Sequence, residues 1–333
     1  MASIFFENFP TIDKSCILDW CISLLCEKGY QLNDRSFTVV KDSAWSYCGY
    51  YITTFGKIYL KCMPPKIDQE GAIFDFFRKL HEPVPNILGI DPKSNSIIMQ
   101  DMGCPLREIL FKKFDIKLIC RAVEQFSKLQ KNSTIYYEEF FKLGIPNWQV
   151  HDVKSLLFYI ISSEKYFVLD GLEKHDWDIF LKNQRKIEQC WKNLEQFNIP
   201  DTIVQCDFHD NNILINDESN IITFIDFGEL VISHPIFSIL QFMAQLEKHH
   251  HITSSQKEYW VILKSYFKEY ETLLDRTEYA NIISTAYIPW LCFGVMCQLR
   301  LIEACGAQLI LEYQPHSRAK LIQEINNAIA IQK

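Results

Sequence analysis

Apolar residues change their spacing twice within the first hundred positions. Over residues 12–28 they recur every three or four positions, which predicts a helix with one buried stripe. Three short segments follow, each rich in the β-branched and aromatic residues that favour strands: 36–41, 50–54 and 57–62. Gly56 lies in the connection between the last two segments, as expected for a hairpin turn.

A second helix and a further strand complete the first part of the chain. Residues 67–80 return to the helical spacing, and residues 95–103 return to an extended pattern. We therefore predict a small, mostly antiparallel β lobe over residues 1–103. It contains one prominent helix in addition to the leading one.

Helical patterns dominate the rest of the chain. They predict helices at 105–112, 116–131, 150–162, within 171–198, and through the rest of the chain after the hairpin to Lys333. A polar hairpin at 201–228 interrupts them, with short strands at 212–215 and 221–225 around the turn Asn216–Asn220. We assign residues 104–333 to a mostly helical second lobe that contains this hairpin and a substrate pocket. The predicted fold class is α+β, with two lobes and a cleft.

Size and charge narrow the functional classes. The chain has 333 residues, 48% of them hydrophobic, which is enough for one large or two modest domains. Its net charge is −7, and the sequence shows no basic stripe that would bind a phosphate backbone. We therefore expect no nucleic-acid partner. A mildly acidic surface would suit a cationic small molecule.

Cysteine usage and the apolar segments predict a cytoplasmic protein. The twelve cysteines form no metal-binding pattern, and we expect mostly buried free thiols in a reducing compartment. The first ten residues lack the basic region of a signal peptide. Residues 280–299 carry no charge, but they include Asn281 and Pro289, which favours a buried core helix over a membrane span.

Three oxygen-bearing side chains gather on the polar hairpin. Asp207 and Asn212 lie on the loop that enters one strand, and Asp226 follows the other strand within Ile225–Gly228. We expect them to meet at one end of the hairpin, where carboxylate and amide oxygens would bind Mg²⁺. The order D-x-x-x-x-N followed by D-F-G also matches the spacing of kinase catalytic and metal loops.

The first lobe supplies a candidate ion pair. Lys61 lies on a predicted central strand, and Glu70 lies on the same helical face as Ile73, Phe74 and Phe77. An acidic group on an inward face is costly unless it is paired. We therefore predict that Glu70 pairs with Lys61, which would reach the phosphates of a nucleotide.

These motifs resemble the aminoglycoside phosphotransferase and choline kinase superfamily, the small-molecule relatives of protein kinases. The resemblance runs from about Phe37 into the C-terminal helices. It is carried by Asp207–Asn212, by Ile225–Gly228, and by the strings "EGAIFDFFRKLHEPVPNILGID" and "SIIMQDMG". "FHDNN" and "SHPIFS" resemble a poorly characterised branch. The resemblance implies a protein-kinase-like fold with a small antiparallel β N-lobe and a mostly helical C-lobe.

The resemblance also implies roles for these residues. Asp207 would be the catalytic base or orienting carboxylate for a substrate hydroxyl, and Asn212 and Asp226 would hold Mg²⁺. Lys61 would contact the α- and β-phosphates of ATP, and Glu70 would fix Lys61.

Further nucleotide contacts are implied at two turns of the first lobe. Backbone groups from Gln100 to Met102 would meet the adenine. Trp45 and Ser46 would cover the phosphates.

Some positions depart from the superfamily pattern. Gln205 replaces the usual His two places before Asp207, and Ser238 replaces an Asp that braces the loop. The Gly-rich loop of protein kinases is absent, since only Gly49 and Gly56 lie nearby.

Other residues near these motifs favour structural roles. We interpret His209 as a residue that braces the loop, with substrate contact as the alternative. Cys206 is interpreted as a small packing residue. The run His249–His251 is interpreted as a solvated helix end, because no Cys or acidic cluster adjoins it.

The leading hypothesis is a cytoplasmic, ATP- and Mg²⁺-dependent kinase that phosphorylates a hydroxyl of an aminoglycoside-, choline- or sugar-like molecule. One alternative is a non-catalytic, nucleotide-binding pseudokinase module, suggested by Gln205 and the missing Gly-rich loop. Another is a kinase that acts on protein side chains. It ranks lower because a helical pattern follows Gly228 almost at once and leaves little platform for a peptide.

Overall fold

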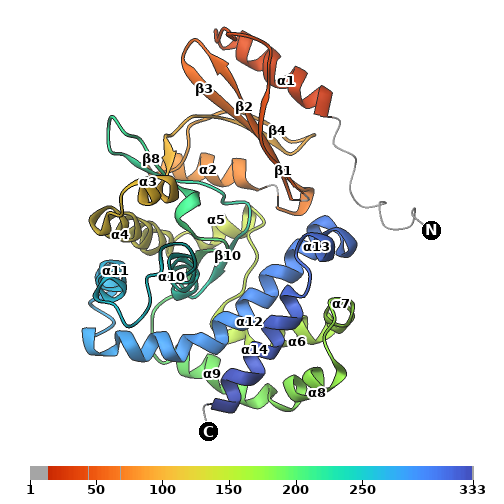
Figure 1. Cartoon of the computed structure of the whole chain (residues 1–333), viewed down its shortest axis with the longest axis vertical. Helices are drawn as coiled ribbons and strands as arrows, with labels where there is room; N and C mark the ends of the chain where they lie inside the picture. The colour runs from red at the N-terminus through yellow and green to blue at the C-terminus, as the bar shows by residue number, and fades with distance from the viewer. Residues whose placement is uncertain (1–13, 44, 68, 332–333) are drawn as a thin grey trace, which may run out of the picture. The chain divides into compact units, whose positions relative to one another are not determined.

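The computed structural model describes residues 14–43, 45–67 and 69–331 and divides the chain into two compact units (Figure 1). Unit 1 combines the N-terminal part through Cys104 with Leu214–Gly228 and Leu301–Tyr313. Unit 2 contains Pro105–Ile213, Glu229–Arg300 and the C-terminal part from Gln314. The first positions of the predicted leading helix, residues 12 and 13, lie outside the described residues.

Unit 1 is built on a five-stranded antiparallel sheet with the strand order β1-β2-β3-β5-β4. The strands are β1 Thr38–Ser43, β2 Ser46–Thr53, β3 Gly56–Cys62, β4 Ile87–Asp91 and β5 Ser96–Gln100. Gly56 has a φ of +97°, so a residue with a side chain would be strained in the tight β2–β3 turn. Strand β3 is central, which places Lys61 in the interior of the sheet.

Two helices pack on this sheet. Helix α1, Lys14–Glu27, lies beside the sheet (Figure 1). It buries Cys21 and Leu25 in one cluster with Tyr51 and Leu60 of the sheet. Helix α2, Glu70–Lys79, approaches β5 so closely that a Cβ on Gly71 would lie 2.7 Å from a side-chain carbon of Ile97. Glycine at this position therefore brings the first turn of α2, and Glu70 with it, against the sheet.

A small three-stranded sheet, in the order β6-β8-β9, contains the tip of the polar hairpin. Its strands are β6 Cys104–Pro105, β8 Ile213–Ile215 and β9 Ile222–Phe224. Gly103, at φ +110°, lies against Ile215, and a Cβ there would lie 2.1 Å from the Ile215 carbonyl oxygen. Short elements complete unit 1: the 3-10 turn η1 Pro65–Ile67 and helix α13 Ala307–Tyr313.

Unit 2 is mostly helical and contains a two-stranded antiparallel sheet of β7 Thr202–Gln205 and β10 Leu230–Ser233. Its helices are α3 Leu106–Lys112, α4 Ile116–Ser133, α5 Tyr137–Lys142, α6 Val153–Ser162, α7 Glu164–Leu169, α8 Lys174–Lys182, α9 Gln184–Glu195, α10 Ile236–His250, α11 Lys257–Phe267, α12 Tyr279–Cys305 and α14 Ser317–Ile331. The last residues of α12 are grouped with unit 1. Short 3-10 turns are η2 Val150–Asp152, η3 Asp210–Asn212, η4 Lys268–Tyr270 and η5 Arg276–Glu278.

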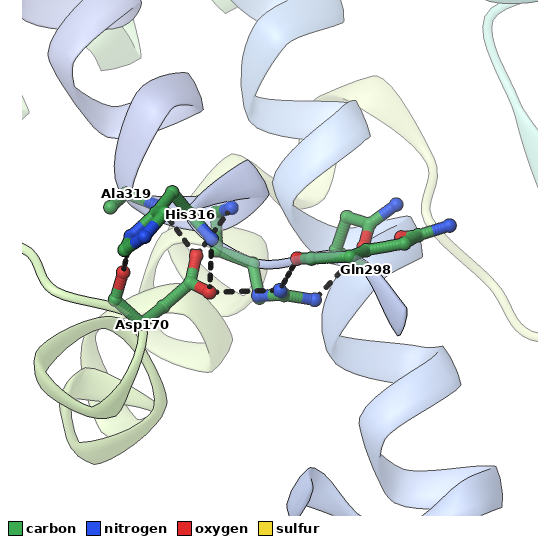
Figure 2. Close-up of polar contacts among 6 residues, drawn as sticks. Asp170, Gln298, His316 and Ala319 are labelled. Carbon is green, nitrogen blue, oxygen red and sulfur yellow. Dashed lines mark hydrogen bonds and ion pairs between the residues drawn. The ribbon is translucent and has the colours of Figure 1, made fainter. Parts of the chain in front are cut away.

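A buried ion pair fixes the start of α14 (Figure 2). The Asp170 carboxylate accepts hydrogen bonds from the backbone N–H groups of His316, Arg318 and Ala319 at 2.8 to 3.0 Å. It also accepts one from the Arg318 guanidinium at 2.9 Å, and Arg318 donates to the Gln298 side chain of α12 at 3.2 Å. The Asp170 carboxylate therefore accepts the hydrogen bonds of free N–H groups at the N-terminus of α14. It also neutralises the fully buried Arg318 guanidinium.

The α+β fold class predicted from the sequence is confirmed. Four strands were missed: β4, β6, β7 and β10, each of five residues or fewer and without a clear turn signal on both sides. The predicted helical stretch 171–198 is divided into α8 and α9 at Asn183.

The apolar segment near residue 290 forms a helix, as predicted. By length and composition, Arg276–Cys305 could cross a membrane, and 61% of its most apolar window is buried inside the structure. All twelve cysteines are free thiols, but the expectation that most are buried is wrong: five are buried, five are partly exposed, and Cys16 and Cys26 are exposed.

Candidate active site

Lys61 forms the centre of a charged cluster in unit 1. Its Nζ lies 2.6 Å from Oε2 of Glu70 and 2.6 Å from Oδ1 of Asp226. Lys61 is only 8% exposed and Glu70 is buried, whereas the Asp226 side chain is 35% exposed. The ion pair that the sequence predicts between Lys61 and Glu70 is therefore present, and Asp226 joins it.

The cluster carries one cation for two carboxylates. Burial alone would lower the pKa of Lys61, but Asp226 and Glu70 raise it above its usual value, so the ammonium stays charged. Burial raises the pKa of Glu70, Lys61 opposes the rise, and the nearby charge of Asp226 adds to it. The excess negative charge would be relieved by a further cation beside Asp226.

The backbone around Asp226 is held in an uncommon conformation. Asp226 has a φ of +66°, in the left-handed region that non-glycine residues rarely adopt. The next peptide N–H, at Phe227, donates a 2.8 Å hydrogen bond to Oε1 of Glu70, and the Phe227 ring packs against Phe74 and Phe77. Gly228 lies so close to η1 that a Cβ would be 2.8 Å from the Ile67 carbonyl oxygen. These contacts of its neighbours fix the direction of the Asp226 carboxylate.

The loop between β7 and β8 carries the other predicted chemical groups, in unit 2. The Asn212 side-chain amide donates a 2.9 Å hydrogen bond to the backbone carbonyl of Asp207. Because its NH₂ group is used in this way, Asn212 presents its Oδ1 as a hard oxygen ligand of the kind that Mg²⁺ prefers. The Asp207 side chain is 53% exposed, so its carboxylate is accessible.

A buried network anchors this loop despite the departures at Gln205 and Ser238. The Gln205 backbone N–H donates to Oγ of Ser238 at 3.1 Å, so serine also fixes the start of the loop. Gln130 donates to the Ile203 carbonyl at 2.8 Å and accepts from the Tyr266 hydroxyl at 2.5 Å. The β7 end is therefore held from α4, α10 and α11.

The predicted phosphate-covering residues lie at the β1–β2 hairpin turn. The edge of the Trp45 ring contacts Tyr313 with a centroid distance of 5.6 Å, and Lys41 lies 5.5 Å from the Trp45 centroid. Ser46 is buried, and its backbone carbonyl accepts from the Ser43 hydroxyl. These contacts restrain the turn, and the phosphate-covering role of Trp45 and Ser46 stays a prediction.

The predicted adenine-binding segment follows β5. The Gln100 backbone N–H donates to the Asn86 carbonyl at 3.1 Å, and the Asp101 backbone N–H donates to the Lys57 carbonyl at 3.3 Å. Within the described part of the chain, the backbone N–H and carbonyl of Met102 form no hydrogen bond. Met102 thus has a donor and an acceptor available for a base, and this role too stays a prediction.

His209 and Cys206 make contacts within unit 2 that agree with structural interpretations. His209 Nε2 lies 3.2 Å from Oδ2 of Asp207, and the Cys206 thiol donates to the Glu229 carbonyl at 2.9 Å. Gln241 of α10 also donates to Asp207 Oδ1, at 3.4 Å.

The interpretation of His249–His251 as a solvated helix end is wrong for His250. This ring is buried, and its Nε2 lies 2.7 Å from Oδ2 of Asp210, which is itself fully buried and bonded to Arg107. Burial opposes ionisation of Asp210, but hydrogen bonds from Arg107 and His250 outweigh it and lower the pKa of this carboxyl. Sequence spacing gave no signal for this cluster, because its members are up to 143 positions apart in the numbering, from 107 to 250.

The predicted metal ligands fall in different units. Lys61, Glu70 and Asp226 belong to unit 1, and Asp207 and Asn212 belong to unit 2. That these five residues act together in one reaction therefore stays a prediction.

Solved kinase structures share the fold of this chain. An ethanolamine kinase from Plasmodium vivax has a TM-score of 0.64 and 13% identity, with 97% of this chain and 92% of that chain covered. Amicoumacin kinase hAmiN, in complex with AMP-PNP and Ca²⁺, has a TM-score of 0.58 and 15% identity over 95% and 93% of the two chains. The aminoglycoside phosphotransferase APH(4)-Ia, with AMP-PNP and hygromycin B, has a TM-score of 0.58 and 12% identity over 92% and 97%. The fold is therefore kinase-like.

A protein-family model also matches part of the chain. Residues 164–244 match the model described as the phosphotransferase enzyme family, which confirms the predicted resemblance over the Asp207–Asn212 loop and the Asp226 motif. No curated protein sequence matches the chain. The matched segment and the fold together indicate a kinase-type phosphotransferase.

Proposed function

We propose that this protein transfers the γ-phosphate of ATP to a hydroxyl group of a small molecule. The observation that carries the proposal is the position of Lys61, buried between Glu70 and Asp226 at 2.6 Å from each. An ammonium held by one buried carboxylate and next to a partly exposed one is suited to phosphates and to their metal ion. Phosphoryl transfer needs mainly such positioning and charge neutralisation.

The roles follow from the chemistry of each group. Lys61 binds the α- and β-phosphates, and Glu70 fixes the ammonium. Asp226 and Asn212 would hold Mg²⁺, which would supply charge neutralisation for the phosphates. The exposed Asp207 carboxylate accepts a hydrogen bond from the substrate hydroxyl and orients its oxygen toward the γ-phosphate.

A small-molecule acceptor is favoured over a protein acceptor by the length of the segment after Asp226. Strand β10 begins at Leu230 and α10 begins at Ile236, which leaves no long activation segment to support a peptide. The alternative of a non-catalytic nucleotide-binding module predicts binding of ATP without turnover. A cytoplasmic location, where ATP and Mg²⁺ are available, would suit the proposed activity.

The test measures ATP consumption with Mg²⁺ across a panel of aminoglycosides, amino alcohols and sugars. We expect at least one acceptor to stimulate turnover, and both Asp207→Ala and Asp226→Ala to abolish the stimulation. Asp217→Ala, on the exposed β8–β9 turn, is the matched control and should keep full activity. Turnover that survives both active-site substitutions would contradict the assigned roles.

Thermal shift combined with the turnover assay separates the enzyme from the non-catalytic module. A ligand that binds only the folded state raises the melting temperature, so ATP with Mg²⁺ should stabilise the wild-type protein. Stabilisation without any turnover on the panel would favour the module. An absence of any nucleotide effect would contradict both.

A further inference from the structure

Asp210 has no role in the proposed chemistry, yet it is the most tightly bound carboxylate of the Asp207–Asn212 loop. Its side chain is fully buried, at 0% exposure. Arg107 Nε donates to Oδ1 at 2.7 Å, and Nη2 lies 2.6 Å from the same oxygen. His250 Nε2 lies 2.7 Å from Oδ2, so both oxygens are held by cationic or ring donors.

The two partners of Asp210 come from different helices. Arg107 lies in the first turn of α3, and His250 is the last residue of α10, while Asp210 begins η3. The three residues therefore tie one loop to two helices that are remote from it in sequence. We call Arg107, Asp210 and His250 the loop brace.

Aromatic rings cover the loop brace. Phe111 and Phe114 lie 5.0 and 6.2 Å from the His250 ring, centroid to centroid. The His250 side chain is 4% exposed and that of Arg107 is 14% exposed. Since little water reaches these charges, their attraction is weakly screened and their geometry is narrowly defined.

The loop brace is connected to Asp207 through a short stretch of backbone and through hydrogen bonds within the turn. Only two residues separate Asp207 from Asp210, and the Asn212 N–H donates to the His209 carbonyl within this turn. The Asn212 side chain returns to the Asp207 carbonyl, and His209 lies against the Asp207 carboxylate. A shift of Asp210 would therefore move both Asp207 and Asn212.

We propose that Arg107 and His250 are positioning residues, which hold Asp207 and Asn212 in the reactive geometry through Asp210. The inference rests on the proposed function for its effect on rate. Among the described residues, the side chains of Arg107 and His250 bond to Asp210 and not to Asp207 or Asn212. Their loss should lower kcat far more than nucleotide affinity, because Lys61 and Asp226 belong to unit 1 and only Asn212 among the proposed nucleotide and metal ligands would shift.

The kinetic test uses paired substitutions. Arg107→Met and His250→Leu should each lower kcat by about 10²-fold, as expected for a misplacement of about 1 Å, with less than about a threefold change in KM for ATP. Arg107→Lys and His250→Gln keep a donor and should recover most of the rate. The double variant should resemble either single variant, because both act through the same carboxylate.

Matched controls remove nearby charge without touching the brace. Lys112→Met on α3 and Lys248→Met on α10 are exposed and should keep wild-type kcat. A loss of rate in these controls, failure of the conservative variants to recover, or a KM that rises in proportion as kcat falls would overturn the proposal.

Hydrogen exchange gives a readout that does not depend on turnover. In Arg107→Met the Asn212 amide should exchange faster, while amides of β7 and the centre of α10 stay protected. Unchanged exchange at Asn212 would overturn the inference even if the enzyme is active. If the wild-type protein has no turnover, the proposed function fails, and the exchange result still decides whether the brace holds the loop. A variant that melts below the assay temperature is replaced by its conservative partner, for which we expect intermediate exchange.

Discussion

Lys61 of unit 1 and Arg318 of unit 2 are both buried cations, but they are neutralised in opposite ways. Arg318 is fully buried, and its carboxylate partner Asp170 is buried as well and also accepts three backbone N–H groups of α14 (Figure 2). Lys61 faces two carboxylates, and one of them, Asp226, remains about one-third exposed. One cluster is balanced and closed, and the other carries excess negative charge at an accessible oxygen.

The difference supports a structural role for the Asp170–Arg318 pair and the proposed chemical role for the Lys61 cluster. A closed pair, in which a buried carboxylate balances a buried cation, fixes the geometry of two segments and leaves no net charge for a ligand to neutralise. A cluster with one carboxylate too many gains from a further cation, which a metal ion would provide. Balance and exposure of charge therefore discriminate between the two clusters, although both contain one buried cation and a buried carboxylate.

The largest effect is expected from Asp226→Asn. Turnover of the best acceptor should fall by about 10³-fold or more, because the proposed metal ligand is lost. The melting temperature should stay the same or rise, because Lys61 and Glu70 then form a balanced pair. Steady-state kinetics and thermal unfolding of the same samples check this. A large loss of stability would show that the Lys61 cluster is structural, like the Asp170 cluster.

Asp170→Ala should produce the reverse result. It leaves Arg318 as an uncompensated buried charge and removes the acceptor for the start of α14, which should lower the free energy of unfolding by about 3 to 5 kcal/mol. Turnover per folded molecule should remain close to that of the wild type. Urea unfolding measures the loss, and Glu164→Ala on the exposed face of α7 is the control. A loss below about 1 kcal/mol would contradict the structural role.

Glu70→Gln should have an intermediate effect on turnover. The amide oxygen can still accept the hydrogen bond from Phe227, but it no longer fixes the Lys61 ammonium by charge. We expect kcat/KM to fall by about 10- to 100-fold, which corresponds to about 1.4 to 2.7 kcal/mol. An activity equal to that of the wild type would show that Asp226 alone positions Lys61.

The smallest effect is expected on stability at low pH, from the buried His234 side chain, which stays uncharged in the folded protein. Burial lowers the pKa of His234 in unit 2 to about 3, and its Nδ1 accepts from the Ile236 N–H at 3.3 Å. The unfolded chain takes up a proton at this residue below about pH 6.5, whereas the folded chain does not, so stability is lost as the pH falls. Between about pH 7 and pH 5.5 the loss should be about 1 kcal/mol.

His234→Gln tests this assignment, because glutamine does not titrate. Urea unfolding at the two pH values should show a smaller decrease in stability for the variant than for the wild type. Equal decreases in the free energy of unfolding would show that groups other than His234 cause the loss of stability at low pH.

Short-range sequence signals predicted the chemical groups better than the contacts that hold them. The Asp207–Asn212 spacing, the Asp226 motif and the charged residue on the inner face of α2 were readable, because each lies within one turn or one helix face. Arg107 and His250 could not be assigned in this way, and Ser238 was singled out only through the superfamily resemblance. Their roles depend on which residues of α3 and α10 face the loop, and no local period encodes that.

The amino-acid pattern was sufficient to predict the α+β class, most of the longer helices, the central strand of Lys61 and the pairing of Lys61 with Glu70. Hydrophobic spacing and the high cost of an unpaired inward charge act locally, so a single chain reveals them. The tertiary structure alone decided that Asp210 is clamped by Arg107 and His250, and that Asp170 caps α14 beside Arg318. Such contacts join residues far apart in the chain, and their energies depend on burial and on distances of a few ångströms, which exist only after the chain has folded.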